Sequence, residues 1–188
     1  MFPFEEYVTL ASAAALVASG LIVYYRYDRL AGGLWLVGSS AFLLVSLALV
    51  VMGIDALGLE VTPLLGSVYP AFIAAAVASA RGYGLHYSGF AVAMLALIAL
   101  GITTGVDALK GASHGVLHSA SGLVIVLAPI YYYLKGLAGR AALLVSLGGV
   151  VISIGGLALA AIAMGREILP LDLVIFILHP YWPSQQSY

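Results

Sequence analysis

The chain consists largely of apolar runs that have about the length of a membrane-crossing helix. Six such runs can be placed in the 188 residues, at 7–25, 33–53, 62–80, 89–105, 114–134 and 141–165. A helix needs about 17 to 25 residues to cross the hydrocarbon of a bilayer. Hydrophobic residues make up 63% of the sequence and charged residues 8%, more apolar surface than a soluble domain of this size can bury. We therefore predict an all-α integral membrane protein with six transmembrane helices.

A five-residue motif follows every second run. It is Gly-Ile-Asp-Ala-Leu at 53–57, Gly-Val-Asp-Ala-Leu at 105–109 and, more loosely, Gly-Arg-Glu-Ile-Leu at 165–169. This repeat predicts three helical hairpins, at 7–53, 62–105 and 114–165, within one polytopic membrane domain that covers residues 1–188. Because each hairpin has an even number of spans, all three should point the same way, as parallel repeats about an axis along the membrane normal. In the remaining segment, 168–188, the apolar stretch 169–178, bounded by Pro170 and Pro180, is too short to cross, and we expect the segment to lie in the interface or to re-enter the membrane.

The charged residues predict an orientation. The connections 26–32, 81–88 and 135–140 hold five of the seven basic residues and one acidic residue, which is typical of cytoplasmic loops. Seven of the eight acidic residues fall on the opposite side. We therefore expect a multi-pass protein of the cell membrane with both termini outside.

Three acidic residues, Asp55, Asp107 and Glu167, recur in the motif. Just beyond the C-terminal end of a helix a carboxylate faces the negative pole of the helix dipole, so helix stability alone does not explain them. In one interpretation, the preceding glycine ends the helix in a left-handed conformation and the acid caps the next turn. In the other, the three carboxylates form a ring at the outer mouth of the bundle that attracts cations.

His114 and His118 lie four residues apart, so they should share one face of the fifth helix. We expect Ser113 to be the N-cap of that helix and Asp107 to lie in the preceding loop. Two imidazoles at this spacing can bind Zn²⁺, Cu²⁺ or Ni²⁺, and His179 and Asp107 are candidates for further ligands. The alternative is that interfacial histidines only bond to carbonyl groups or water. A fourth histidine, His86, falls in a cytoplasmic loop and cannot join this site.

Several classes of protein are disfavoured by what the sequence lacks. It has no Cys, which excludes disulfides, iron-sulfur clusters and thiolate metal ligands. No predicted span carries Asp, Glu, Lys or Arg, which argues against a proton pump. No catalytic motif is recognisable, so we expect no enzyme. The sequence also has no Asn and two Gln, a shortage of thermolabile amides that is typical of thermophiles.

Three functions remain open. The leading hypothesis is a protein that binds or conducts a cation, such as a divalent metal ion, through an acidic, histidine-bearing outer face. The second is a subunit of a respiratory membrane complex that binds a b-type haem, through His118 with His179 or His114, or a quinone. The third is a structural subunit of a membrane assembly without cofactor. In each case the expected partners are lipid and other membrane subunits or a second copy of the chain, and no nucleic acid.

Overall fold

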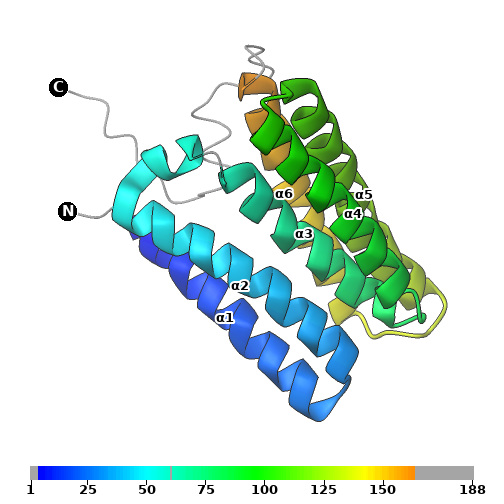
Figure 1. Ribbon diagram of the computed structural model, residues 1–188. Coiled ribbons are helices and arrows are strands. Elements are labelled where there is room, and N and C mark those ends of the chain that lie inside the picture. The colour runs from blue at the N-terminus through cyan, green and yellow to red at the C-terminus, as the bar shows by residue number, and fades with distance from the viewer. Residues whose placement is uncertain (1–3, 60, 164–188) are drawn as a thin grey trace. The chain divides into compact units, whose positions relative to one another are not determined.

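The computed structural model describes residues 4–59 and 61–163, which form six α-helices and one 3-10 helix and contain no strand (Figure 1). The elements in chain order are α1 (Phe4–Arg26), α2 (Arg29–Met52), the 3-10 helix η1 (Gly53–Gly58), α3 (Thr62–Ser79), α4 (Gly84–Thr104), α5 (Asp107–Leu134) and α6 (Ala141–Ala163). The all-helical prediction is confirmed for these residues, and each predicted run coincides with one helix.

Four helices begin earlier than predicted, namely α1, α2, α4 and α5. Hydropathy marks the part of a helix that suits hydrocarbon, whereas capping groups set where the helix starts. At the start of α2, for example, the Asp28 side chain accepts a hydrogen bond from the backbone N–H of Ala31 at 2.9 Å. Asp28 is therefore an N-cap, and the connection between α1 and α2 is only residues 27 and 28.

Within the described part of the chain, four helices are long and apolar enough to cross a membrane, namely α1, α2, α4 and α5. The described apolar stretches of α3 and α6 are shorter, at Leu64–Ser79 and Ala141–Val151. A multi-pass membrane protein is compatible with these lengths.

The chain forms two compact units, Met1–Ala128 and Pro129–Tyr188. The first contains α1 to α4 and most of α5, and the second contains the last turns of α5 followed by α6. The boundary falls inside α5 at Pro129, which has no backbone N–H to donate to the helix. In the second unit, Gly136 has a φ of +69° and the backbone N–H of Leu137 donates to the carbonyl of Tyr132 at 2.8 Å, which ends α5.

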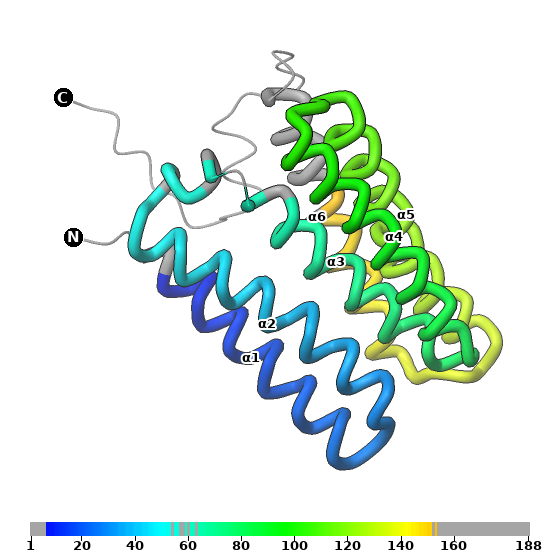
Figure 2. The backbone as a smooth tube through the Cα atoms, viewed as in Figure 1, coloured from blue at the N-terminus to red at the C-terminus, as the bar shows by residue number. Residues whose placement is uncertain are grey.

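In the first unit, helices adjacent in sequence are packed together. The pairs α1 with α2, α2 with α3 and α3 with α4 are in contact, and the tube in Figure 2 shows α1 and α2 lying side by side. Trp35 on α2 donates through its indole Nε1 to the carbonyl of Leu16 on α1 at 3.0 Å. Phe42 on α2 stacks on Tyr69 of α3, with ring centroids 4.7 Å apart.

Glycines allow these helix backbones to approach closely. A Cβ atom added at Gly38 of α2 would lie 2.9 Å from the carbonyl oxygen of Tyr69 on α3. One added at Gly101 of α4 would lie 2.6 Å from the backbone nitrogen of Lys110 on α5. Both distances are shorter than real Cβ contacts, so these crossings require glycine.

The buried core of the first unit lies between α3, α4 and α5. Its wholly buried members are Ala71 of α3, Ala91 and Ile98 of α4, and Leu117 of α5. On α3, five alanines are buried together with Ile73 and Ser67. Because α3 presents small side chains to its neighbours, polar groups on α3 and α5 can meet inside the bundle.

Candidate functional site

The two histidines of the predicted pair lie together on α5. Their rings are stacked, with centroids 5.6 Å apart and an angle of 26° between the ring planes. Since α5 begins at Asp107, His118 stands twelfth among its 28 residues. The pair therefore lies deeper along the helix than the expected position at its outer start.

Ser67 of α3 contacts the first histidine. Its Oγ atom lies 2.7 Å from Nδ1 of His114, and the serine is completely buried. This hydrogen bond joins α3 to α5 and fixes the orientation of the His114 ring. The sequence gives no reason to pair these residues, because they are 47 positions apart.

The second histidine has an unsatisfied ring nitrogen. Nδ1 of His118 is buried and has no hydrogen-bond partner among the described residues. Leaving a buried polar atom unpaired costs about 1 to 3 kcal/mol. A bound ligand that engages this nitrogen would remove that cost.

A pair of hydroxyl groups lies one turn further along α5. The Oγ atom of Ser121 donates to the carbonyl of Leu117 at 2.7 Å, and it lies 2.9 Å from the hydroxyl of Tyr87 on α4. Because a serine hydroxyl has one hydrogen, Ser121 accepts from Tyr87. Polar side chains from three helices thus follow one another through an otherwise apolar interior. We name this set, Ser67, His114, His118, Ser121 and Tyr87, the polar strip.

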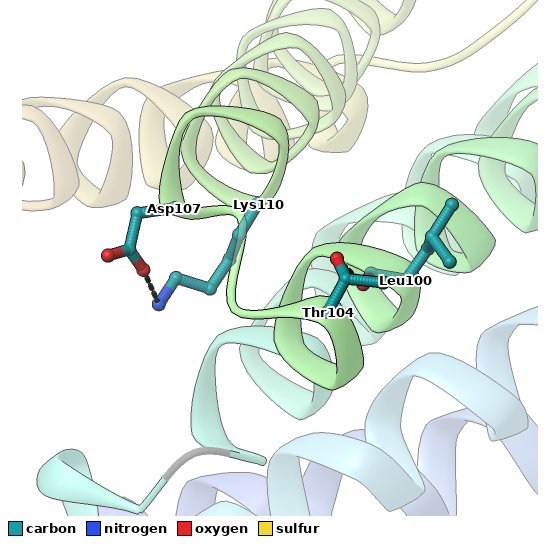
Figure 3. Close-up of polar contacts among 4 residues, drawn as sticks. All are labelled: Leu100, Thr104, Asp107 and Lys110. Carbon is teal, nitrogen blue, oxygen red and sulfur yellow. Dashed lines mark hydrogen bonds and ion pairs between the residues drawn. The ribbon is translucent and has the colours of Figure 1, made fainter.

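Asp107 lies in the first turn of α5, and the prediction that it belongs to a loop is wrong. Its Oδ1 atom forms an ion pair with Nζ of Lys110 at 2.7 Å (Figure 3). The carbonyl of Val106 accepts the first hydrogen bonds of α5, so the helix begins there. The prediction that Ser113 is the N-cap is therefore wrong, and Ser113 lies buried in the second turn. At a helix N-terminus the dipole favours a carboxylate, and helix stability therefore does account for Asp107.

The ion pair also changes the acidity of Asp107. Asp107 is exposed at the start of α5 and precedes the predicted span 114–134. There the hydrogen bond from Lys110, together with its positive charge, holds the pKa of the Asp107 carboxyl below its usual value. Asp107 is about 10 Å along the helix axis from His114, at 1.5 Å per residue.

The turn before Asp107 follows the predicted helix-ending arrangement. Gly105 has the left-handed conformation, with φ +69° and ψ 16°, and its N–H donates to the carbonyls at the end of α4. In the same last turn the Thr104 hydroxyl donates to the carbonyl of Leu100 at 2.6 Å (Figure 3). Gly53 also has a positive φ, of 62°, and ends α2. Both glycines end a helix as predicted, but only Gly105 has the left-handed conformation, because the ψ of Gly53 is −148°.

The other candidate residues are spread more widely. Asp55 is exposed on η1, whereas Glu167 and His179 lie outside the described residues. Among the residues that are described, no three of the His, Asp and Glu side chains lie close enough together to hold a metal ion. His86 belongs to the exposed first turn of α4 rather than to a loop, with its ring 6.3 Å from that of Tyr83.

Comparisons of the chain with models of known protein families, with curated proteins and with solved structures find no match. The functional argument therefore rests on the geometry of the polar strip.

Proposed function

We propose that the chain is a multi-pass protein of the cell membrane that binds a cation through an acidic, histidine-bearing outer face. One observation carries this proposal. Two stacked, half-buried imidazoles lie on α5, and Nδ1 of His118 is buried without a partner among the described residues. Polar groups are costly within a membrane, and ionisable side chains at such positions commonly mark a path or site for ions.

The proposed architecture is a single polytopic domain of three like-oriented hairpins, at 7–53, 62–105 and 114–165, with both termini outside. In its support, the connections α2–α3 and α4–α5 lie at one end of the first unit (Figure 1). They carry Asp55 and lead into Asp107. The segment 168–188, which lies outside the described residues, would lie in the interface or re-enter the membrane at the same side.

The candidate residues take two roles in this proposal. Asp55, Asp107 and Glu167 attract cations to the outer face, an effect that does not require direct ligation. His114 and His118 bind the ion, and His179 would add a third ligand. Because the Asp107 carboxylate is already paired with Lys110, we propose that it attracts cations to this face more than it binds the ion directly.

The geometry favours a metal ion over a b-type haem. The axial ligands of a haem approach the iron from opposite sides, whereas His114 and His118 lie side by side on one face of α5. A haem would therefore need a histidine from another element, such as His179, together with one of this pair. A structural subunit without cofactor would leave the His118 nitrogen unsatisfied.

Ligand-dependent thermal stability tests the proposal. A cation that binds the folded state raises the melting temperature of the purified full-length protein, and the stabilisation grows with the logarithm of its concentration relative to the dissociation constant. We expect a rise for the parent chain and for His86→Ala, whose side chain is exposed, and little rise for the double variant H114A/H118A. An identical response of the double variant and the parent would contradict the site. An absorption band in the visible range typical of haem would contradict the metal assignment.

A further inference from the structure

We infer that the cation is a divalent transition metal ion such as Zn²⁺, Ni²⁺ or Cu²⁺, held by Nε2 of His114 and Nδ1 of His118, with Ser67 as the residue that positions His114. This inference rests on the proposed function and specifies its ligand. It follows from the type of donor atoms, from the hydrogen bond of Ser67 and from the buried nitrogen of His118.

The donor atoms select the metal. Imidazole nitrogen suits zinc, copper and nickel, whereas K⁺, Mg²⁺ and Ca²⁺ take oxygen ligands. Around the histidine pair the structure places the hydroxyl of Ser67 and the apolar side chain of Leu117, which is completely buried. Asp107 is about two helical turns from His114 and is paired with Lys110. The described surroundings therefore lack the carboxylates that a hard cation requires.

Ser67 selects the ligating atom of His114. When Nδ1 of a histidine is engaged by a hydrogen bond, Nε2 becomes the metal ligand, and the hydrogen bond fixes the ring and raises its basicity. The contact of 2.7 Å between Ser67 Oγ and His114 Nδ1 has this arrangement in the tautomer whose Nδ1–H donates to Ser67. Ser67 does not touch the ion in this scheme and acts only through His114.

The spacing of the rings suits a shared ion. Two imidazoles that bind one tetrahedral ion through bonds of about 2.0 to 2.1 Å have centroids roughly 5 Å apart. The observed centroid distance of 5.6 Å is close to this value, and both rings must turn out of their stacked orientation to point one nitrogen each at a shared ion. Binding would also give Nδ1 of His118 the partner that it lacks among the described residues.

Two protein ligands leave coordination positions open. Structural zinc sites are closed by four protein ligands, whereas sites that keep open positions exchange their ligands. A site built on this pair would therefore keep coordination positions for water or another ligand.

Titration of the full-length protein in detergent with Zn²⁺ tests the inference, with Ca²⁺, Mg²⁺ and K⁺ in parallel. We expect Zn²⁺ to bind and the other three not to. Replacing either histidine, as His114→Ala or His118→Ala, should weaken Zn²⁺ binding by at least tenfold. Removing a residue that orients a metal ligand typically costs about 10- to 100-fold in affinity, which is the effect expected for Ser67→Ala.

The pH dependence of Zn²⁺ affinity shows whether Ser67 positions the His114 ring or only fills space beside it. Without the Ser67 hydroxyl, His114 becomes less basic, so protons compete with the metal at a lower pH and the midpoint of the affinity profile moves down. Ser67→Thr keeps a hydroxyl and should restore both affinity and midpoint. The matched control is Ser88→Ala, because Ser88 of α4 bonds to the carbonyl of Gly84, outside the polar strip, and it should leave Zn²⁺ binding unchanged.

The outcomes distinguish this inference from the proposed function. If Ca²⁺, Mg²⁺ or K⁺ binds in place of Zn²⁺, and Asp55→Asn with Asp107→Asn abolishes that binding, the inference is overturned and the proposed function stands. Zn²⁺ binding that is unaffected by both histidine variants overturns the inference as well. If no cation binds to the folded parent chain, both are overturned.

Discussion

At the scale of single residues, Gly105 shows how the sequence sets the geometry of the acidic end. Its left-handed conformation reverses the chain within the two residues between α4 and α5, so that Asp107 immediately begins the next helix. A side chain in this conformation costs about 1 to 2 kcal/mol because Cβ meets the following carbonyl oxygen.

Gly105→Ala is therefore expected to destabilise the protein by about 1 to 2 kcal/mol. The matched control is Gly111→Ala in α5, where an added Cβ meets no atom within 4 Å. Since alanine stabilises the middle of a helix by about 0.5 to 1 kcal/mol relative to glycine, the control variant should be neutral or stabilising. Unfolding by denaturant in detergent measures both, and equal losses of stability would contradict the assignment of Gly105 as a conformational requirement.

At the scale of helices, α4 and α5 approach closely beside the short link that joins them. Gly101 of α4 lies against the backbone of Lys110 on α5, whereas Tyr87 meets Ser121 toward the other end of α4. A larger residue at position 101 would push the two backbones apart at this crossing.

We expect Gly101→Ala to cost about 1 to 3 kcal/mol, the usual cost of overpacking. Gly89→Ala is the control within the same helix, because a Cβ added at Gly89 has no neighbour within 4 Å. Thermal unfolding in detergent compares the two variants with the parent. The close-packing argument fails if the two alanine variants have the same melting temperature.

The sequence predicted the helices better than it predicted their contacts. Apolar runs located all six helices because a membrane-length run has few alternatives. The apolar runs place the start of α5 too late, because hydropathy excludes the charged residues Asp107 and Lys110 although their ion pair stabilises the first turn. Ser67 and Tyr87 were missed as members of the polar strip, because their partners are 47 and 34 positions away and no local pattern encodes such a contact.

At the scale of the whole molecule, the proposed orientation depends on the number of crossings. If every helix crosses the membrane, the connections that carry Asp55 and precede Asp107 face one side, and the connection at Tyr27 faces the other. Because the sequence contains no Cys, single cysteines can be introduced without background labelling.

Asp55→Cys and Asp107→Cys should react with a membrane-impermeant maleimide from the same side of sealed vesicles. Tyr27→Cys, at an exposed position between α1 and α2, should react only from the opposite side. Mass shift on a gel measures the labelling before and after the vesicles are opened by detergent. Labelling of positions 55 and 107 from different sides would exclude the parallel hairpins and the common acidic face.

The brevity of the link between α4 and α5 also limits how the first unit can move. With only residues 105 and 106 between them, neither helix can slide or turn by a full helical repeat unless the other follows. A movement of α4 would therefore carry the first turns of α5, and His114 with them, in the same direction.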